Sequence, residues 1–113
     1  MMENNSECIN ALLPVGDALD VISGKWKLLI LISISSGNHR FTDIERSIPK
    51  ISAKVLSKEL KELEAHTLIK RTVYDQSPVL IKYTITPYTE TLYPIIEELR
   101  LWGLNHRKVI TGK

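Results

Sequence analysis

Apolar residues in the first third of the chain recur at helical spacing and predict two helices. The first runs from about Pro14 to Ile22, where the proline suits a first helical turn, and we expect residues 1–13 to form a flexible N-terminal segment. The second, Lys25 to Ser35, is apolar around almost its whole circumference. Such a helix is typical of a core surrounded by other elements, so we expect it, with Trp26, at the centre of the fold.

Two shorter helices follow and are joined by a tight connection. Thr42 and Glu45 have the spacing of a capping box, which predicts a helix from about Phe41 to Ser47. Ser52 is suited to cap the next helix, residues 52–65, which is strongly amphipathic. Its apolar stripe consists of Leu56, Leu60 and Leu63. Two short helices in this arrangement form a helix-turn-helix.

Beyond residue 68 the period of the pattern changes from helical to alternating. Residues 80–85 alternate as in a half-buried strand, and the β-branched run Ile69 to Tyr74 is its partner. A last helix begins with Thr86 as its cap and Pro87 in its first turn, and Pro94 should bend it. We therefore predict a mainly helical α+β fold, a winged helix-turn-helix in a single domain spanning residues 1–113.

The charge distribution is informative although the net charge is only +2. Residues 1–20 carry four acids and no Lys or Arg, whereas residues 39–71 carry eight bases against five acids. The middle of the chain therefore has the basic balance that suits nucleic acid. A single cysteine excludes an intramolecular disulfide, and no secretory signal or membrane-length apolar run is readable, so we expect a cytoplasmic protein.

An ordered set of short motifs resembles the HxlR family of winged-helix regulators. These motifs are Leu19-Asp20-Val21-Ile22, Gly24-Lys25-Trp26, Arg40-Phe41, Ile51-Ser52, Val55-Leu56-Ser57, Leu60, Leu63-Glu64, Tyr83-Thr84-Ile85-Thr86-Pro87 and Trp102-Gly103. The resemblance spans nearly the full chain from Pro14. It implies a bacterial, MarR-like transcription regulator that binds DNA as a homodimer. The first and last helices would form the subunit interface, and helix 52–65 would enter the major groove of a pseudo-palindromic operator.

The sequence departs from the family pattern at four places. Many members carry a redox-sensing cysteine where this chain has Leu13, and Cys8 lies five residues upstream. Thr67 and Thr89 replace two usual glycines, and Leu80 takes a wing position that is often basic. Cys8 is favoured as an incidental thiol over a redox sensor, because no base lies near it in sequence to lower its pKa. If it does sense oxidants, an intersubunit disulfide is the simplest route.

The candidate DNA-binding residues combine cations for phosphates with short polar side chains that allow close approach to base edges. They are Arg40, Thr42, Ser52, Ala53, Lys54, Ser57, Lys58, Lys61, Arg71 and Lys82. The alternative for the helix is an ordinary solvated face, and for Arg40 and Thr42 it is simple helix capping.

The candidate dimer interface consists of apolar residues that the domain has too few elements to cover. They are Val15, Leu19, Ile22, Leu92, Ile96, Leu99 and Trp102. For Trp102 the alternative is packing within its own chain.

No set of residues predicts catalysis, a metal site or a cofactor. Ser47 and Lys50 have S-x-x-K spacing, but Pro49 interrupts the turn between them, and the three histidines are scattered. We therefore predict that the protein is not an enzyme. The main rival is a winged-helix module that binds a protein partner without sequence-specific DNA binding. A small thiol-dependent enzyme or sensor, and control by a small-molecule or redox effector, stay open.

Overall fold

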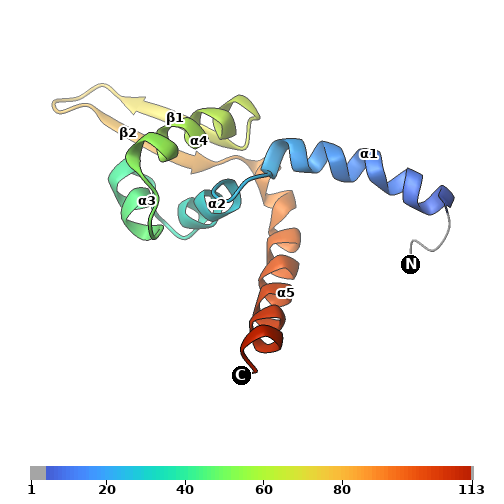
Figure 1. Cartoon of the computed structure of the whole chain (residues 1–113). Coiled ribbons are helices and arrows are strands. Elements are labelled where there is room, and N and C mark those ends of the chain that lie inside the picture. Colours follow the sequence, from blue (N-terminus) through green and yellow to red (C-terminus); the bar gives the residue numbers. More distant parts are fainter. Residues whose placement is uncertain (1–4, 113) are drawn as a thin grey trace.

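The computed structural model describes residues 5–112, with side chains described from residue 8. Its elements in order are α1 (Asn5–Ile22), α2 (Lys27–Ser35), α3 (Phe41–Ser47), α4 (Ala53–Ala65), β1 (Ile69–Tyr74), β2 (Leu80–Ile85), the 3-10 helix η1 (Pro87–Leu92) and α5 (Tyr93–Thr111). Figure 1 shows α2, α3, α4 and the base of the hairpin gathered in one body, from which α1 and α5 extend in different directions. This is the predicted mainly helical fold with a two-stranded wing.

The core lies where α2, α3, α4 and the start of β1 meet. Ile30 and Leu31 of α2 are fully buried, as is Ile44 of α3. The predicted apolar stripe of α4 is buried with them, and Leu68 and Ile69 close the cluster. Burial of a side chain of this size contributes about 1.5 to 3 kcal/mol. The core therefore fixes α4 against α2 and leaves the polar side of α4 outward.

The wing is an antiparallel pair whose strand bounds agree with the prediction. Its register pairs Ile69 with Ile85, Arg71 with Tyr83, and Thr72 with Lys82. Directly paired residues project from the same face of a sheet, and neighbours along a strand from opposite faces. All six residues of β2 are partly exposed, so the alternation in its sequence does not produce an alternation in burial.

The first helix is longer than predicted. It begins at Asn5 rather than near Pro14, so that the described part of the segment we expected to be irregular is helical and Pro14 lies inside α1. The apolar residues Ile9 and Leu12 continue the three- and four-residue spacing, and the proline removes only one backbone donor. The helix therefore continues through Pro14 instead of beginning there.

Three predictions about helix ends are wrong. The N-cap of α3 is Arg40, with no side-chain cap bond, so Thr42 and Glu45 lie too far into the helix to form a capping box. Thr86 precedes η1 but does not cap it with its side chain. Pro94 lies in the first turn of α5, where a missing N–H costs nothing, so the chain forms a 3-10 helix and then a new helix instead of one bent helix.

The molecule is extended for its length. Its radius of gyration is 16.9 Å and its extents are 60 × 36 × 23 Å, whereas a compact chain of this size has a radius of about 13 Å. The difference comes from α1 and α5, which pack little against the body (Figure 1).

Candidate functional site

The outward side of α4 is polar and basic. Ser52 caps the helix, and its Oγ accepts a hydrogen bond from the Val55 backbone N–H at 3.1 Å. Lys54, Lys58 and Lys61 are exposed, as is Ala53, and Ser57 is half-buried. Within residues 8–112 none of the three lysine ammonium groups forms a hydrogen bond or an ion pair. Their charges therefore remain available to an external anion.

A partly buried ion pair holds α4 against α2. Lys27 Nζ lies 2.8 Å from Oε2 of Glu59 and 2.8 Å from Oε2 of Glu62. The side chains of Lys27 and Glu59 are only 11% and 12% exposed. Burial alone would lower the pKa of Lys27, but the two carboxylates together raise it above its usual value. The hydrogen bond from Lys27, followed by its charge, lowers the pKa of Glu62.

The ion pairs of Lys27 with Glu59 and Glu62 were not predicted from the sequence. Glu59 and Glu62 lie 32 and 35 positions after Lys27, so no local spacing in the sequence reveals these contacts. The one signal was a lysine inside an otherwise apolar helix, because a lysine is almost never buried without a partner.

The wing is tied to the loop before α3. The backbone N–H of Tyr83 donates to the carbonyl of His39 at 2.7 Å, and Nδ1 of His39 lies 3.1 Å from the Tyr83 carbonyl oxygen. Arg40 and Thr42, predicted to approach DNA, are exposed at the adjacent start of α3. The wing base, α3 and α4 are thus held at a fixed spacing.

The two basic wing residues do not face the same way. Arg71 pairs with Tyr83 and shares a sheet face with the buried Ile69, whereas Lys82 pairs with Thr72 on the other face. Nζ of Lys82 lies 5.7 Å from the ring centroid of Tyr74. Arg71 therefore lies on the wing face that meets the body, and Lys82 does not.

A hollow of about 370 Å³ lies between α4, the start of α3 and the base of the wing. Its lining combines aromatic and apolar groups with two cations, a hydroxyl and one carboxylate. These residues are Phe41, Ser57, Leu60, Lys61, Glu64, Arg71 and Tyr83. Three of the predicted DNA-binding residues, from α4 and β1, are brought together here.

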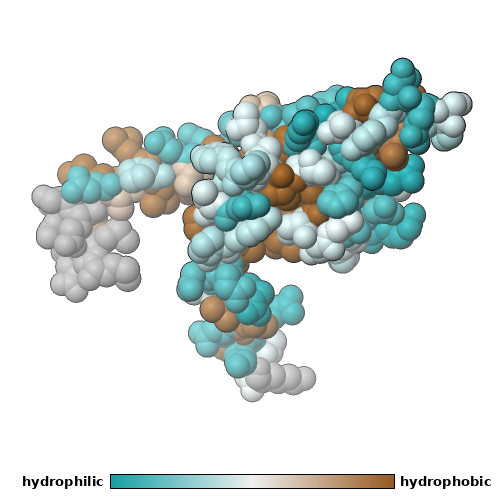
Figure 2. All heavy atoms as spheres, turned by 180° about the vertical axis from the view of Figure 1, so that it is seen from behind, coloured by the Kyte–Doolittle hydropathy of each residue, from teal (hydrophilic) through white to brown (hydrophobic). Residues whose placement is uncertain are grey.

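Apolar side chains are exposed along α1 and α5 (Figure 2). Of the predicted interface residues, Val15, Leu19 and Leu99 are about half exposed, and Trp102 is 67% exposed with its ring stacked on that of His106. Three others are only partly exposed: Ile22, Leu92 and Ile96. Of these, Ile22 and Leu92 pack against the core of their own chain.

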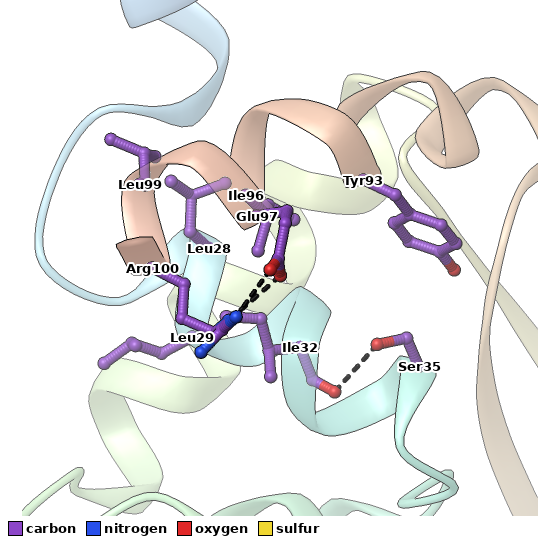
Figure 3. Close-up of a pocket in the computed structure, with 9 residues that line it drawn as sticks. All are labelled: Leu28, Leu29, Ile32, Ser35, Tyr93, Ile96, Glu97, Leu99 and Arg100. Atoms are coloured by element: carbon purple, nitrogen blue, oxygen red, sulfur yellow. Dashed lines mark hydrogen bonds and ion pairs between the residues drawn. The ribbon is translucent and has the colours of Figure 1, made fainter. Parts of the chain in front are cut away.

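A second hollow, of about 510 Å³, lies between α2 and α5 (Figure 3). Leu29 and Ile32 of α2 line it and are exposed, so the prediction that other elements surround α2 on all sides is wrong for this face. The cause is that α5 leaves the body instead of packing along α2. Glu97 and Arg100 form an ion pair at its edge, with Nε 2.9 Å from Oε2. Trp26, predicted as core, is half-buried and packs against the edge of the core cluster.

Cys8 is exposed on α1, and so is Leu13, the residue at the family's usual cysteine position. Within residues 8–112 no group of three or more His, Cys, Asp or Glu side chains is placed to hold a metal ion. None of the helices in the described part of the chain is both long and apolar enough to cross a bilayer.

The chain is similar to known regulators over most of its length. The sequence model of the HxlR-like helix-turn-helix family matches residues 21–110. The HTH-type transcriptional regulator YybR of Bacillus subtilis (strain 168) is 38% identical over 97 residues, covering 86% of this chain and 78% of that protein. BH0655, an HTH-type transcriptional regulator of Halalkalibacterium halodurans, is 42% identical over 95 residues, covering 83% and 84%.

A solved structure shares the fold. The redox regulator HypR in its reduced form superposes with a TM-score of 0.80 at 37% identity, over 88% of this chain and 99% of that one.

Proposed function

The chain belongs to the HxlR-like helix-turn-helix family of transcriptional regulators, and from this premise we propose that it binds duplex DNA as a homodimer. In this proposal α4 of each subunit enters the major groove of a pseudo-palindromic operator. The observation that carries the proposal is the outward face of α4, with three exposed lysines whose ammonium groups make no hydrogen bond or ion pair within residues 8–112.

The proposed contacts with DNA are of two chemical kinds, to the phosphates and to the base edges. Lys54, Lys58 and Lys61 would neutralise phosphates, and Arg40, Thr42 and Lys82 would contact the backbone from α3 and the wing. Ser52 uses its oxygen as acceptor in the cap, and its O–H stays available to donate to a base. Ala53 and Ser57 are small enough to let α4 approach base edges closely.

The dimer would form through α1 and α5. Their exposed apolar side chains, which include Val15, Leu19, Leu99 and Trp102 of the predicted set, need a cover that the chain itself does not provide. Redox control is not part of the proposal, although HypR is a redox regulator. The chain's one cysteine, Cys8, does not occupy the family's position.

The proposal is tested by fluorescence anisotropy with a labelled duplex taken from upstream of the protein's own gene, across a salt series. Counterion release predicts that affinity falls steeply, by about 10³-fold or more between 50 and 200 mM salt for six or more phosphate contacts. Lys58→Ala should weaken binding to every duplex, whereas Lys25→Ala, an exposed lysine away from α4, should not. Equal binding by both variants, or affinity insensitive to salt, would contradict the proposal and favour a protein partner.

A further inference from the structure

The hollow between α4, α3 and the wing has a mixed lining that suits one kind of ligand. Phe41, Leu60 and Tyr83 give it an apolar and aromatic part, from three different elements. Ser57, Lys61 and Arg71 give it a hydroxyl and two cations. We infer that this hollow, called the backbone seat below, holds one deoxyribose-phosphate unit of the DNA backbone. The inference rests on the proposed function.

The two cations are unsatisfied within the chain. Lys61 and Arg71 are exposed, and neither side chain makes a hydrogen bond or an ion pair with any residue of the described range 8–112. The charges come from separate elements, α4 and β1, and converge on the same hollow. Two cations around one concave surface favour an anion, and a guanidinium fork with an ammonium group is well suited to phosphate.

The seat is preorganised. Leu60 in its wall is buried in the core, which fixes the turn of α4 that carries Ser57 and Lys61. On the wing side, the paired hydrogen bonds between His39 and Tyr83 fix β2 beside α3. The register then places Arg71 directly opposite Tyr83, on the face of the wing that meets the body. Little ordering of the main chain is therefore needed on binding.

The apolar part distinguishes a sugar-phosphate unit from a bare anion. The C–H surface of deoxyribose can pack on the rings of Phe41 and Tyr83 while the phosphate accepts hydrogen bonds from the cations. A base is excluded because the bases of an intact duplex stay stacked inside it, and the sugar-phosphate backbone is what it presents between grooves. Glu64, the one acid in the lining, opposes the phosphate and should limit affinity.

The test uses the full-length protein and a fluorescein-labelled duplex of mixed sequence, about 30 base pairs long, because non-specific binding is almost entirely electrostatic. Arg71→Ala and Lys61→Ala should each weaken binding about tenfold and make the slope of log affinity against log salt shallower by about 1 for each subunit bound. Lys25→Ala is the control, an exposed cation just before α2 that lies outside both the hollow and the proposed DNA contacts. It should change neither quantity.

Two further variants test whether the residues share one ligand. The double variant Lys61→Ala with Arg71→Ala should lose less than the product of the two single losses, because both residues contact the same phosphate. Glu64→Gln should tighten binding about threefold through removal of a repulsive charge. All these side chains are exposed, so each variant should melt within about 2 °C of the wild type by circular dichroism.

The backbone seat would be ruled out if Arg71→Ala behaved like Lys25→Ala, if the two single losses multiplied, or if Glu64→Gln left affinity unchanged, with wild-type binding intact in each case. Absence of salt-dependent binding by the wild-type protein would instead overturn the proposed function and the seat together.

Discussion

Lys27 combines a charge with a position on the inner side of α2, and two carboxylates of α4 compensate it. In Lys27→Met the apolar stem is kept and the charge is removed, which leaves Glu59 buried without a cation. We expect a loss of about 3 kcal/mol in the free energy of unfolding, measured by urea denaturation. Lys25→Met, whose ammonium is exposed over the Trp26 ring, should cost less than about 1 kcal/mol. If both variants lost the same free energy of unfolding, the buried contacts of Lys27 would contribute no more to stability than the exposed Lys25.

The same pair predicts how stability depends on pH. The folded-state pKa of Glu62 is lowered, so its contribution is complete above the unfolded pKa and is lost as the pH falls through the folded value. The pKa of Lys27 is raised, so its contribution is complete below its usual value and is lost as the pH rises past the raised one. Stability should therefore fall below about pH 4.5 and again above about pH 10.5. In Lys27→Met the acid-side loss should shrink or reverse.

Thr67 has a positive φ of 61°, a region that a β-branched residue adopts at a cost. Thr67→Gly should raise the free energy of unfolding by about 1 kcal/mol, because glycine tolerates this conformation. Thr72→Gly, in the middle of β1, should have the opposite sign. Thermal melts of both variants check this; destabilisation by both would mean that the Thr67 side chain matters more than its backbone.

The role of a single side chain could be predicted where its hydrogen-bond partner is close in the sequence, and could not where the partner is distant. Ser52 was identified correctly as a cap because its partner, Val55, lies three residues away. The Thr42 and Glu45 capping box failed because the same residue types at the same spacing can also lie inside a helix, here with Thr42 two residues after the N-cap Arg40. Thr89 donates to the Leu68 carbonyl at 2.5 Å across 21 positions, a contact that no local pattern reveals.

At the level of helices and strands, the spacing of apolar residues was enough to predict the elements of the body and the wing. The bounds of α3, β1 and β2 agree with the prediction, because each is delimited by a change of period or by a turn. The predicted starts of α1 and α5 were wrong because Pro14 was taken as the start of a helix and Pro94 as a bend within one. Pro14 is accommodated within α1 at the loss of one hydrogen bond, and Pro94 lies where a helix can begin.

The start of α4 allows its fold and its proposed contact with DNA to be separated. Ser52→Ala removes the acceptor for the Val55 N–H and should cost about 1 kcal/mol of stability. Ser52→Asp keeps an acceptor at the cap, and its charge suits the helix N-terminus. That charge would face the phosphates, so Ser52→Asp should fold as well as the wild type and bind DNA poorly. Chemical denaturation and anisotropy on both variants check this, and strong DNA binding by Ser52→Asp would place α4 outside the groove.

For the whole molecule, the arrangement of α1 and α5 could not be deduced from their amphipathic patterns. Those patterns indicated apolar faces but not which residues the chain itself covers. Ile22 and Leu92 pack on the core, whereas Val15, Leu19, Leu99 and Trp102 stay exposed. The sequence pattern also could not show which wing face each cation lies on, because the strand register places Arg71 and Lys82 on opposite faces.

Exposure of Trp102 predicts the effect of a charge on assembly. Trp102→Glu should shift the protein from dimer toward monomer in sedimentation velocity at micromolar concentration, because it places a carboxylate in an apolar contact. Val79→Glu, at a similarly exposed apolar residue near the wing tip, is the control and should leave the sedimentation coefficient unchanged. A dimeric Trp102→Glu protein would remove α5 from the interface.

Two threonine hydroxyls meet where the wing passes into η1. Oγ1 of Thr86 donates to the carbonyl of Thr67 at 2.8 Å, and Oγ1 of Thr89 donates to that of Leu68. No flexible linker separates β2 from η1 and α5, so this junction would transmit a movement of α5 to the wing. In the proposed homodimer, a change in the tilt of α5 would therefore move the wing and alter the distance between the α4 helices of the two subunits.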